Sequence, residues 1–128
     1  MPEQTATVYE QVGGHEFFQA LVSDFYTDIA DDDFLRRLYP EEDLGPAEDR
    51  LRMFLEQYWG GPTDYSATRG HPRLRARHSP YRVDERARNH WLVHMRNALD
   101  NRDLPPELDA EMWDFLVRAA HAMVNVEQ

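Results

Sequence analysis

The spacing of apolar residues is the sequence feature that most constrains the fold. Four segments carry apolar side chains three or four residues apart, which is the period of an amphipathic helix, and no segment alternates apolar and polar residues as a half-buried strand does. The expected helices span residues 15–30, 47–59 and 84–99, and the last one opens at Pro105-Pro106. The sequence therefore predicts an all-α fold, with two long antiparallel helix pairs around one core.

Glycine, proline and aspartate residues mark where these helices end. Gly13-Gly14 breaks the chain before the first long helix, and Gly60-Gly61-Pro62 ends the second. The three aspartates at 31–33 end the first helix and cap a short one over residues 34–39, which Pro40 stops. Residues 1–7 are expected to form a flexible tail. Residues 8–128 are expected to form a single domain that begins with at most one helical turn.

Composition excludes several classes of function. The chain has 128 residues, 41% of them hydrophobic, and no cysteine, so disulfides and thiolate chemistry are excluded. A formal net charge of -10 argues against general binding to nucleic acid or to anionic membranes. No apolar run reaches membrane-spanning length, which argues against membrane insertion, and the N-terminal residues lack the pattern of a signal peptide. We expect a cytoplasmic protein.

One stretch concentrates positive charge in this acidic chain. Residues 69–88 hold seven of the fourteen basic residues, all arginines, against only Asp84 and Glu85. The segment over residues 63–80 has little regular pattern, and a long loop in a compact domain is usually functional or disordered. An anionic ligand with a place for the imidazole of His78 would explain the stretch, and haem offers both iron and two propionates. A solvated basic loop that balances the acidic helices explains the arginines equally well.

Other polar residues on the expected helices leave alternatives open. His90 and His94 stand four residues apart, a spacing that can bind a metal, but no third ligand is evident and structural roles are favoured. Tyr26, Tyr39 and Trp91 are either core residues with satisfied donors or donors that point at a small polar ligand. The sequence contains no phosphate-binding loop and no serine nucleophile motif, and we assign no catalytic residue.

A set of motifs over residues 9 to about 125 carries a family resemblance. These motifs are Val12-Gly13-Gly14, Phe25-Tyr26, LRRLYP over residues 35–40, RLRMFLEQYWGGP over residues 50–62, RGHPRLRARHSPY over residues 69–81, and Trp91. Together they resemble a truncated haemoglobin of the group II class found in actinobacteria. The resemblance implies a two-over-two helical sandwich, which is a shortened globin, and a bound haem b (iron protoporphyrin IX). His78 falls at the proximal position and would ligate the haem iron.

The resemblance also implies roles on the distal side of the haem. Tyr26, Tyr39 and Trp91 would donate hydrogen bonds to a bound ligand. The other implied positions are Ala47 at the gate, Leu51, Phe25, Phe54 and Met95 in the pocket wall, and Arg50, Arg77 and Tyr65 beside the propionates. Because Ala47 cannot donate a hydrogen bond, ligand stabilisation would depend on the two tyrosines and the tryptophan.

Three functions follow as hypotheses. The first is reversible binding of dioxygen, carbon monoxide or nitric oxide for transport, storage or sensing, by a monomer or a homodimer. The second is nitric oxide dioxygenation or a peroxidase-like reaction at the same haem. This reaction needs an external reductase, because the chain has no flavin or nicotinamide domain. The third is a haem-free helical module whose arginine loop binds an acidic partner.

Overall fold

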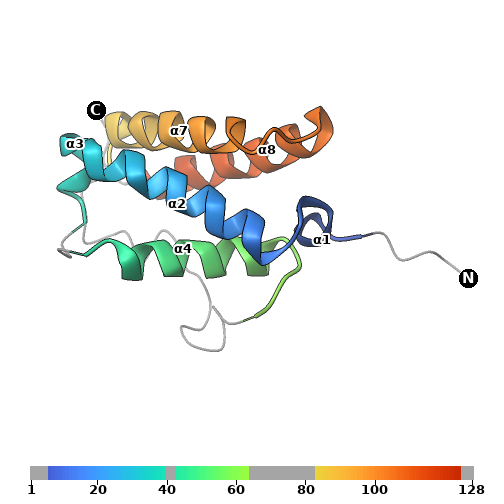
Figure 1. Ribbon diagram of the computed structural model, residues 1–128. Coiled ribbons are helices and arrows are strands. Elements are labelled where there is room, and N and C mark those ends of the chain that lie inside the picture. The colour runs from blue at the N-terminus through green and yellow to red at the C-terminus, as the bar shows by residue number, and fades with distance from the viewer. Residues whose placement is uncertain (1–5, 40–42, 64–82, 125–128) are drawn as a thin grey trace, which may run out of the picture.

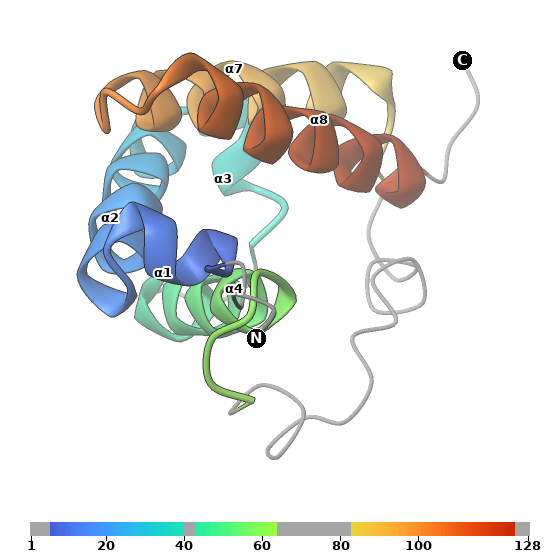
Figure 2. The same cartoon turned by 90° about the vertical axis from the view of Figure 1, so that its right-hand side faces the viewer.

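The computed structural model of the chain describes residues 6–39, 43–63 and 83–124. The helices in these ranges are α1 (Val8–Val12), α2 (His15–Asp31), α3 (Asp33–Arg36), α4 (Gly45–Tyr58), α7 (Glu85–Asp100) and α8 (Pro106–Met123). Helices α2 and α4 form one antiparallel pair and α7 and α8 form the other, with α2 packed on both α4 and α7 (Figure 1; Figure 2). The prediction of an all-α, two-over-two sandwich is confirmed. No helix in the described ranges is long and apolar enough to cross a membrane.

Helix α2 supplies the centre of the core. All the apolar residues that its helical spacing placed on one face are buried, and these are Phe18, Leu21, Val22, Phe25, Tyr26 and Ile29. Met95 and Leu99 of α7 and Met112 and Leu116 of α8 are buried in the same cluster. Burial of a large apolar side chain contributes about 1.5–3 kcal/mol, so this single cluster holds the two helix pairs together.

The glycine pair after α4 lets the N-terminal segment pack closely. Gly60 has a φ of +99°, and a Cβ atom there would lie 2.6 Å from Cγ2 of Thr7. A Cβ atom on Gly61 would lie 2.6 Å from the ring of Tyr9, whose backbone N–H donates to the carbonyl of Trp59. Any larger residue at either position would push α1 away from the end of α4. Thr7, which the sequence placed in the flexible tail, caps α1 in a capping box with Glu10.

The start of α4 and the end of α3 differ most from the sequence-based expectation. Helix α4 begins at Gly45, so Pro46 still lies in its first turn, as expected. Helix α3 is shorter than the expected span of 34–39 and ends at Arg36. Beyond it, the N–H of Leu38 donates to Leu35 and the N–H of Tyr39 donates to Arg36, which are bonds to the third residue back and tighten the chain into a turn.

A buried carboxylate ties the start of α2 to α4. The side chain of Glu56 is only 4% exposed. One of its oxygens lies 2.7 Å from Nδ1 of His15, and the other accepts a hydrogen bond of 2.8 Å from Arg52. Because a buried charge without partners is costly, Arg52 is expected to matter more than an exposed arginine in a similar pair.

Replacing Arg52 with methionine should lower the free energy of unfolding by about 1.5–3 kcal/mol, because the buried carboxylate of Glu56 loses a charge-assisted hydrogen bond. Urea denaturation measures this loss. Arg118→Met is the matched control, since Arg118 forms an exposed pair with Asp114 four residues away. That change should cost no more than about 0.5 kcal/mol. Equal losses in the two variants would show that burial of Glu56 has no special consequence.

Candidate functional site

Tyr26 and Tyr39 come from different elements and meet in the core. Tyr26 lies on the buried face of α2, and Tyr39 follows the turn after α3. Their ring centroids are 5.7 Å apart with the planes nearly perpendicular, and their hydroxyl groups share a hydrogen bond. Trp91 of α7 reaches this pair through Phe25, whose ring centroid is 5.2 Å from that of Trp91 and 5.1 Å from that of Tyr26. The structure thus brings the three expected donors into one aromatic cluster.

Local hydrogen bonds fix the place of Tyr39. Asp32 caps α3 by accepting from the N–H groups of Phe34 and Leu35. Nη1 of Arg36 then donates to the carbonyl oxygen of Tyr39 at 2.8 Å. The backbone that leads from α2 to Tyr39 is therefore held by bonds at each step.

The environment of Tyr26 keeps its hydroxyl protonated. Burial raises the pKa of Tyr26 well above its usual value, and the neighbouring Tyr39 and its hydrogen bond raise it further. The charge of Glu48 acts in the same direction, while the charge of Arg50 lowers the pKa of Tyr26 and offsets only part of the rise. Tyr26 therefore remains a neutral hydrogen-bond donor throughout the physiological pH range.

The expected wall residues belong to the same hydrophobic cluster. Phe25, Ala47 and Met95 are buried, while Leu51 and Phe54 are half-buried and pack against the cluster. The ring of Phe54 also lies 6.4 Å from that of Phe115 on α8. The tyrosine pair therefore belongs to a hydrophobic cluster whose apolar side chains come from α2, α4 and α7.

The residues expected on the proximal side are His78 and the propionate partners. His78, Arg77 and Tyr65 lie outside the described residues. Arg50, the other expected propionate partner, is half-buried on α4, and its charge acts on the Tyr26 phenol.

His90 and His94, for which the sequence favours structural roles, contact the same carboxylate. Both imidazoles contact Oδ2 of Asp32, at 2.8 Å for Nδ1 of His90 and 2.7 Å for Nε2 of His94. Within the described ranges, no group of three His, Cys, Asp or Glu side chains could hold a metal ion. The two histidines thus share one partner, a carboxylate that the sequence indicated only as a helix cap.

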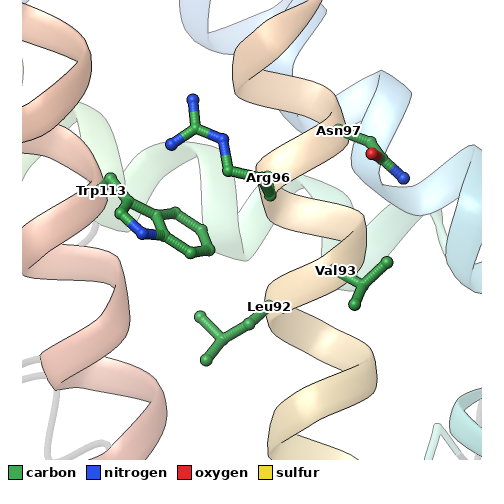
Figure 3. A pocket seen from close by; sticks show the side chains of 5 residues that line it. All are labelled: Leu92, Val93, Arg96, Asn97 and Trp113. Carbon is green, nitrogen blue, oxygen red and sulfur yellow. The ribbon is translucent and has the colours of Figure 1, made fainter.

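A shallow groove of about 260 Å³ lies along α7, beside Trp113 of α8. Leu92 and Arg96 point toward Trp113 of α8, while Val93 and Asn97 point away from it (Figure 3). The guanidinium of Arg96 lies over the Trp113 ring and pairs with Asp100 and Asp109. This groove has no expected site residue in its lining and is separate from the tyrosine pair.

Comparisons with known proteins agree on one family. Residues 7–125 match the family described as Bacterial-like globin. Group 2 truncated hemoglobin YjbI of Bacillus subtilis (strain 168) is 36% identical over 117 residues, which are 91% of this chain and 87% of that protein.

Solved structures give the same answer. A thermostable hemoglobin from the actinobacterium Thermobifida fusca superposes with a TM-score of 0.94 at 58% identity, covering 96% of this chain and all of that one. A truncated oxygen-avid haemoglobin from Bacillus subtilis superposes with a TM-score of 0.88 at 35% identity, covering 94% and 100%. The chain therefore belongs to the bacterial-like globins, as a group II truncated haemoglobin, a family of haem proteins that bind small gaseous ligands.

Proposed function

We propose that this globin binds haem b through His78 and holds dioxygen, or another diatomic ligand, with hydrogen bonds from Tyr26, Tyr39 and Trp91. The observation that carries the proposal is the meeting of the two tyrosine hydroxyls, from different elements, inside an apolar cluster that also contains Trp91. When bound, haem supplies the open coordination position for the ligand and the negative charge that dioxygen acquires there.

The distal residues fit such a group chemically. Two phenols and an indole are neutral donors, so they stabilise a partly negative ligand without placing a full charge in the core. The buried side chains of Phe25, Ala47 and Met95 exclude water, which strengthens each hydrogen bond and suits the flat apolar macrocycle. Arg50, Arg77 and Tyr65 are the proposed partners of the propionates, with Arg50 contributed by α4.

The first test is the absorption spectrum of protein purified after expression with a haem supply. A strong Soret band and a reduced spectrum typical of five-coordinate haem are the expected results. Protein that folds but shows no Soret band would contradict the proposal and would favour the haem-free interaction module.

Because their hydroxyls share a hydrogen bond, the two tyrosines are expected to act as a unit. Oxygen dissociation rates of Tyr26→Phe, Tyr39→Phe and the double variant should give a coupling energy of about 0.5–3 kcal/mol, as residues in one hydrogen-bond network do. The control is the double variant Tyr26→Phe/Arg118→Met, because Arg118 belongs to an exposed ion pair with Asp114. The effects of these two changes on the oxygen dissociation rate should be additive in free energy. Additive effects in the tyrosine pair would show that the two hydroxyls act on the ligand independently.

A redox enzyme at the same haem is the second candidate. Hydrogen bonds to the ligand from the tyrosine pair and from Trp91 would slow its release, which suits a ligand that reacts in place better than one that is delivered. The relative described as oxygen-avid supports this direction. Nitric oxide dioxygenation or a peroxidase-like reaction would then draw electrons from an external reductase. Rapid nitric oxide turnover with a reductase, together with slow oxygen release, would favour the enzyme, whereas fast release would favour transport.

The setting of the protein completes the proposal. We place it in the cytoplasm, as a monomer or a homodimer. Cell fractionation and sedimentation of the purified holoprotein measure these two properties. Recovery in a membrane or secreted fraction would contradict the proposed location.

A further inference from the structure

A single carboxylate joins three elements beside the distal cluster. Oδ2 of Asp32 contacts His90 and His94 of α7, while its Oδ1 accepts from the backbone N–H groups of Phe34 and Leu35 at the start of α3. The Asp32 side chain is only 12% exposed and that of His94 only 17%. One side chain thus uses both oxygens, the first to cap a helix and the second to hold two imidazoles that lie 58 and 62 residues away in sequence.

We propose that Asp32, His90 and His94 form a proton-sensitive latch that positions Trp91 and Tyr39 for ligand binding. This role rests on the proposed function, because it acts on two of the proposed distal donors. Asp32 and the histidines are positioning residues here, and none of them is proposed to touch the ligand.

The latch is connected to Trp91 through α7 and to Tyr39 through the turn after α3. On α7, Trp91 directly follows His90 and precedes His94 by three residues, so the two imidazole contacts fix this turn of the helix against the end of α2. After α2, the backbone carbonyl of Asp32 accepts a hydrogen bond from the N–H of Arg36. The carbonyl of Arg36 accepts from the N–H of Tyr39, and Nη1 of Arg36 donates to the carbonyl of Tyr39. A movement of Asp32 relative to α7 would therefore change the spacing between the two donors.

Protonation changes the charge of the latch. The imidazole nitrogen that faces Asp32 carries the proton in a neutral histidine, so both rings donate to the carboxylate even when uncharged. The second nitrogen of His94, Nδ1, is buried without a hydrogen-bond partner and lies 3.7 Å from a carboxylate oxygen of Asp28. A proton added there would face that carboxylate. Acid therefore adds an attractive interaction between α7 and α2, and the latch tightens as pH falls.

The neighbouring charges support a latch that tightens as pH falls. Asp32 itself stays ionised. Burial alone would raise the pKa of Asp32. The hydrogen bonds from His94, His90 and Leu35 have the larger effect and hold the pKa of Asp32 well below its usual range. Among the described residues, the guanidinium groups of Arg37 and Arg86 lie over the ring of Phe34, and the imidazole of His90 contacts the same ring. Within the described ranges, the charged groups paired with these two histidines are the carboxylates of Asp28 and Asp32.

The first experiment tests the latch by itself. Imidazole proton resonances are followed by NMR from about pH 5 to pH 8 in the purified protein, a range that brackets the ordinary titration of histidine. Asp32→Asn is expected to change the pH dependence of the His90 and His94 resonances together, because it removes the carboxylate that both imidazoles contact. Asparagine keeps the oxygen that caps α3 but loses the charge, so the helix cap is matched. His121, whose Nδ1 bonds the carbonyl of Val117 on its own helix, serves as the reference histidine. Identical titrations of His90 and His94 in wild type and Asp32→Asn would overturn the latch.

The second experiment tests its effect on ligand binding. The double variant His90→Asn/His94→Gln keeps an N–H donor at each contacting nitrogen and removes the titration. Oxygen dissociation in wild type and in His121→Gln should slow by about fivefold from pH 8 to pH 5.5, the lower end of ordinary coupling between sites, while the double variant should show no such change. Equal pH profiles in wild type and the double variant would overturn the positioning role. Failure to bind haem would instead defeat the proposed function and this role together, leaving the NMR titration to decide whether the latch exists.

Discussion

Replacing His78 with alanine is expected to abolish stable haem binding. The family resemblance places this imidazole on the iron, and alanine offers no ligand in its place. Haem affinity should fall by more than about 100-fold, because loss of groups that merely orient metal ligands already costs about 10–100-fold. The Soret absorbance that stays with the protein through gel filtration measures the effect.

His71→Ala is the matched control, since His71 stands in the same arginine-rich stretch. That variant should retain haem at the wild-type ratio. If His78→Ala instead kept a five-coordinate ferrous spectrum, another residue would be the proximal ligand and the mapping of the motif over residues 69–81 would be wrong.

Trp91→Phe is expected to speed oxygen release by up to about tenfold. Phenylalanine keeps an aromatic ring beside Phe25 but removes the indole N–H, and a hydrogen bond contributes about 0.5–1.5 kcal/mol, where 1.4 kcal/mol corresponds to a factor of ten. Rapid mixing of the oxygenated protein with an oxygen scavenger measures the release rate.

Leu51→Val is the control for this change, because it alters the packing of a half-buried wall residue and removes no donor. Its release rate should stay close to that of the wild type. Equal effects of Trp91→Phe and Leu51→Val would mean that Trp91 only fills space, and the distal donors would then be the tyrosines alone.

The helices could be predicted because they follow from local spacing. Every residue on the expected apolar face of α2 is buried, from Phe18 to Ile29, since a helical period places them on one side whatever they pack against. The end of α3 could not be predicted in this way. It depends on the hydrogen bonds of Arg36 with Tyr39, which compete with continuation of the helix. The glycines at 60 and 61 signalled a helix end, but the contact with Thr7 and Tyr9 that requires them is tertiary.

The site could be predicted only in part, for the same reason. Helical spacing placed Tyr26 near the core, yet residues alone did not decide between packing and ligand binding for Tyr26, Tyr39 and Trp91. The family resemblance indicated the pocket, and the structure brings the three into one cluster. The partner of His90 and His94 was missed, because Asp32 lies far away in sequence and its place in a run of aspartates indicated only a cap.

The rate of oxygen release from the wild type and from the triple variant Tyr26→Phe/Tyr39→Phe/Trp91→Phe tests the central claim most directly. Phenylalanine keeps an aromatic ring at each position and removes the donors, although the change at Trp91 also removes some packing volume. The tyrosine pair, whose hydroxyls bond each other, and the indole of Trp91 each supply a hydrogen bond of about 0.5–1.5 kcal/mol to the ligand, so we expect release at least about fivefold faster in the triple variant. A triple variant that retains haem and releases oxygen at the wild-type rate would contradict the claim that these residues hold the ligand.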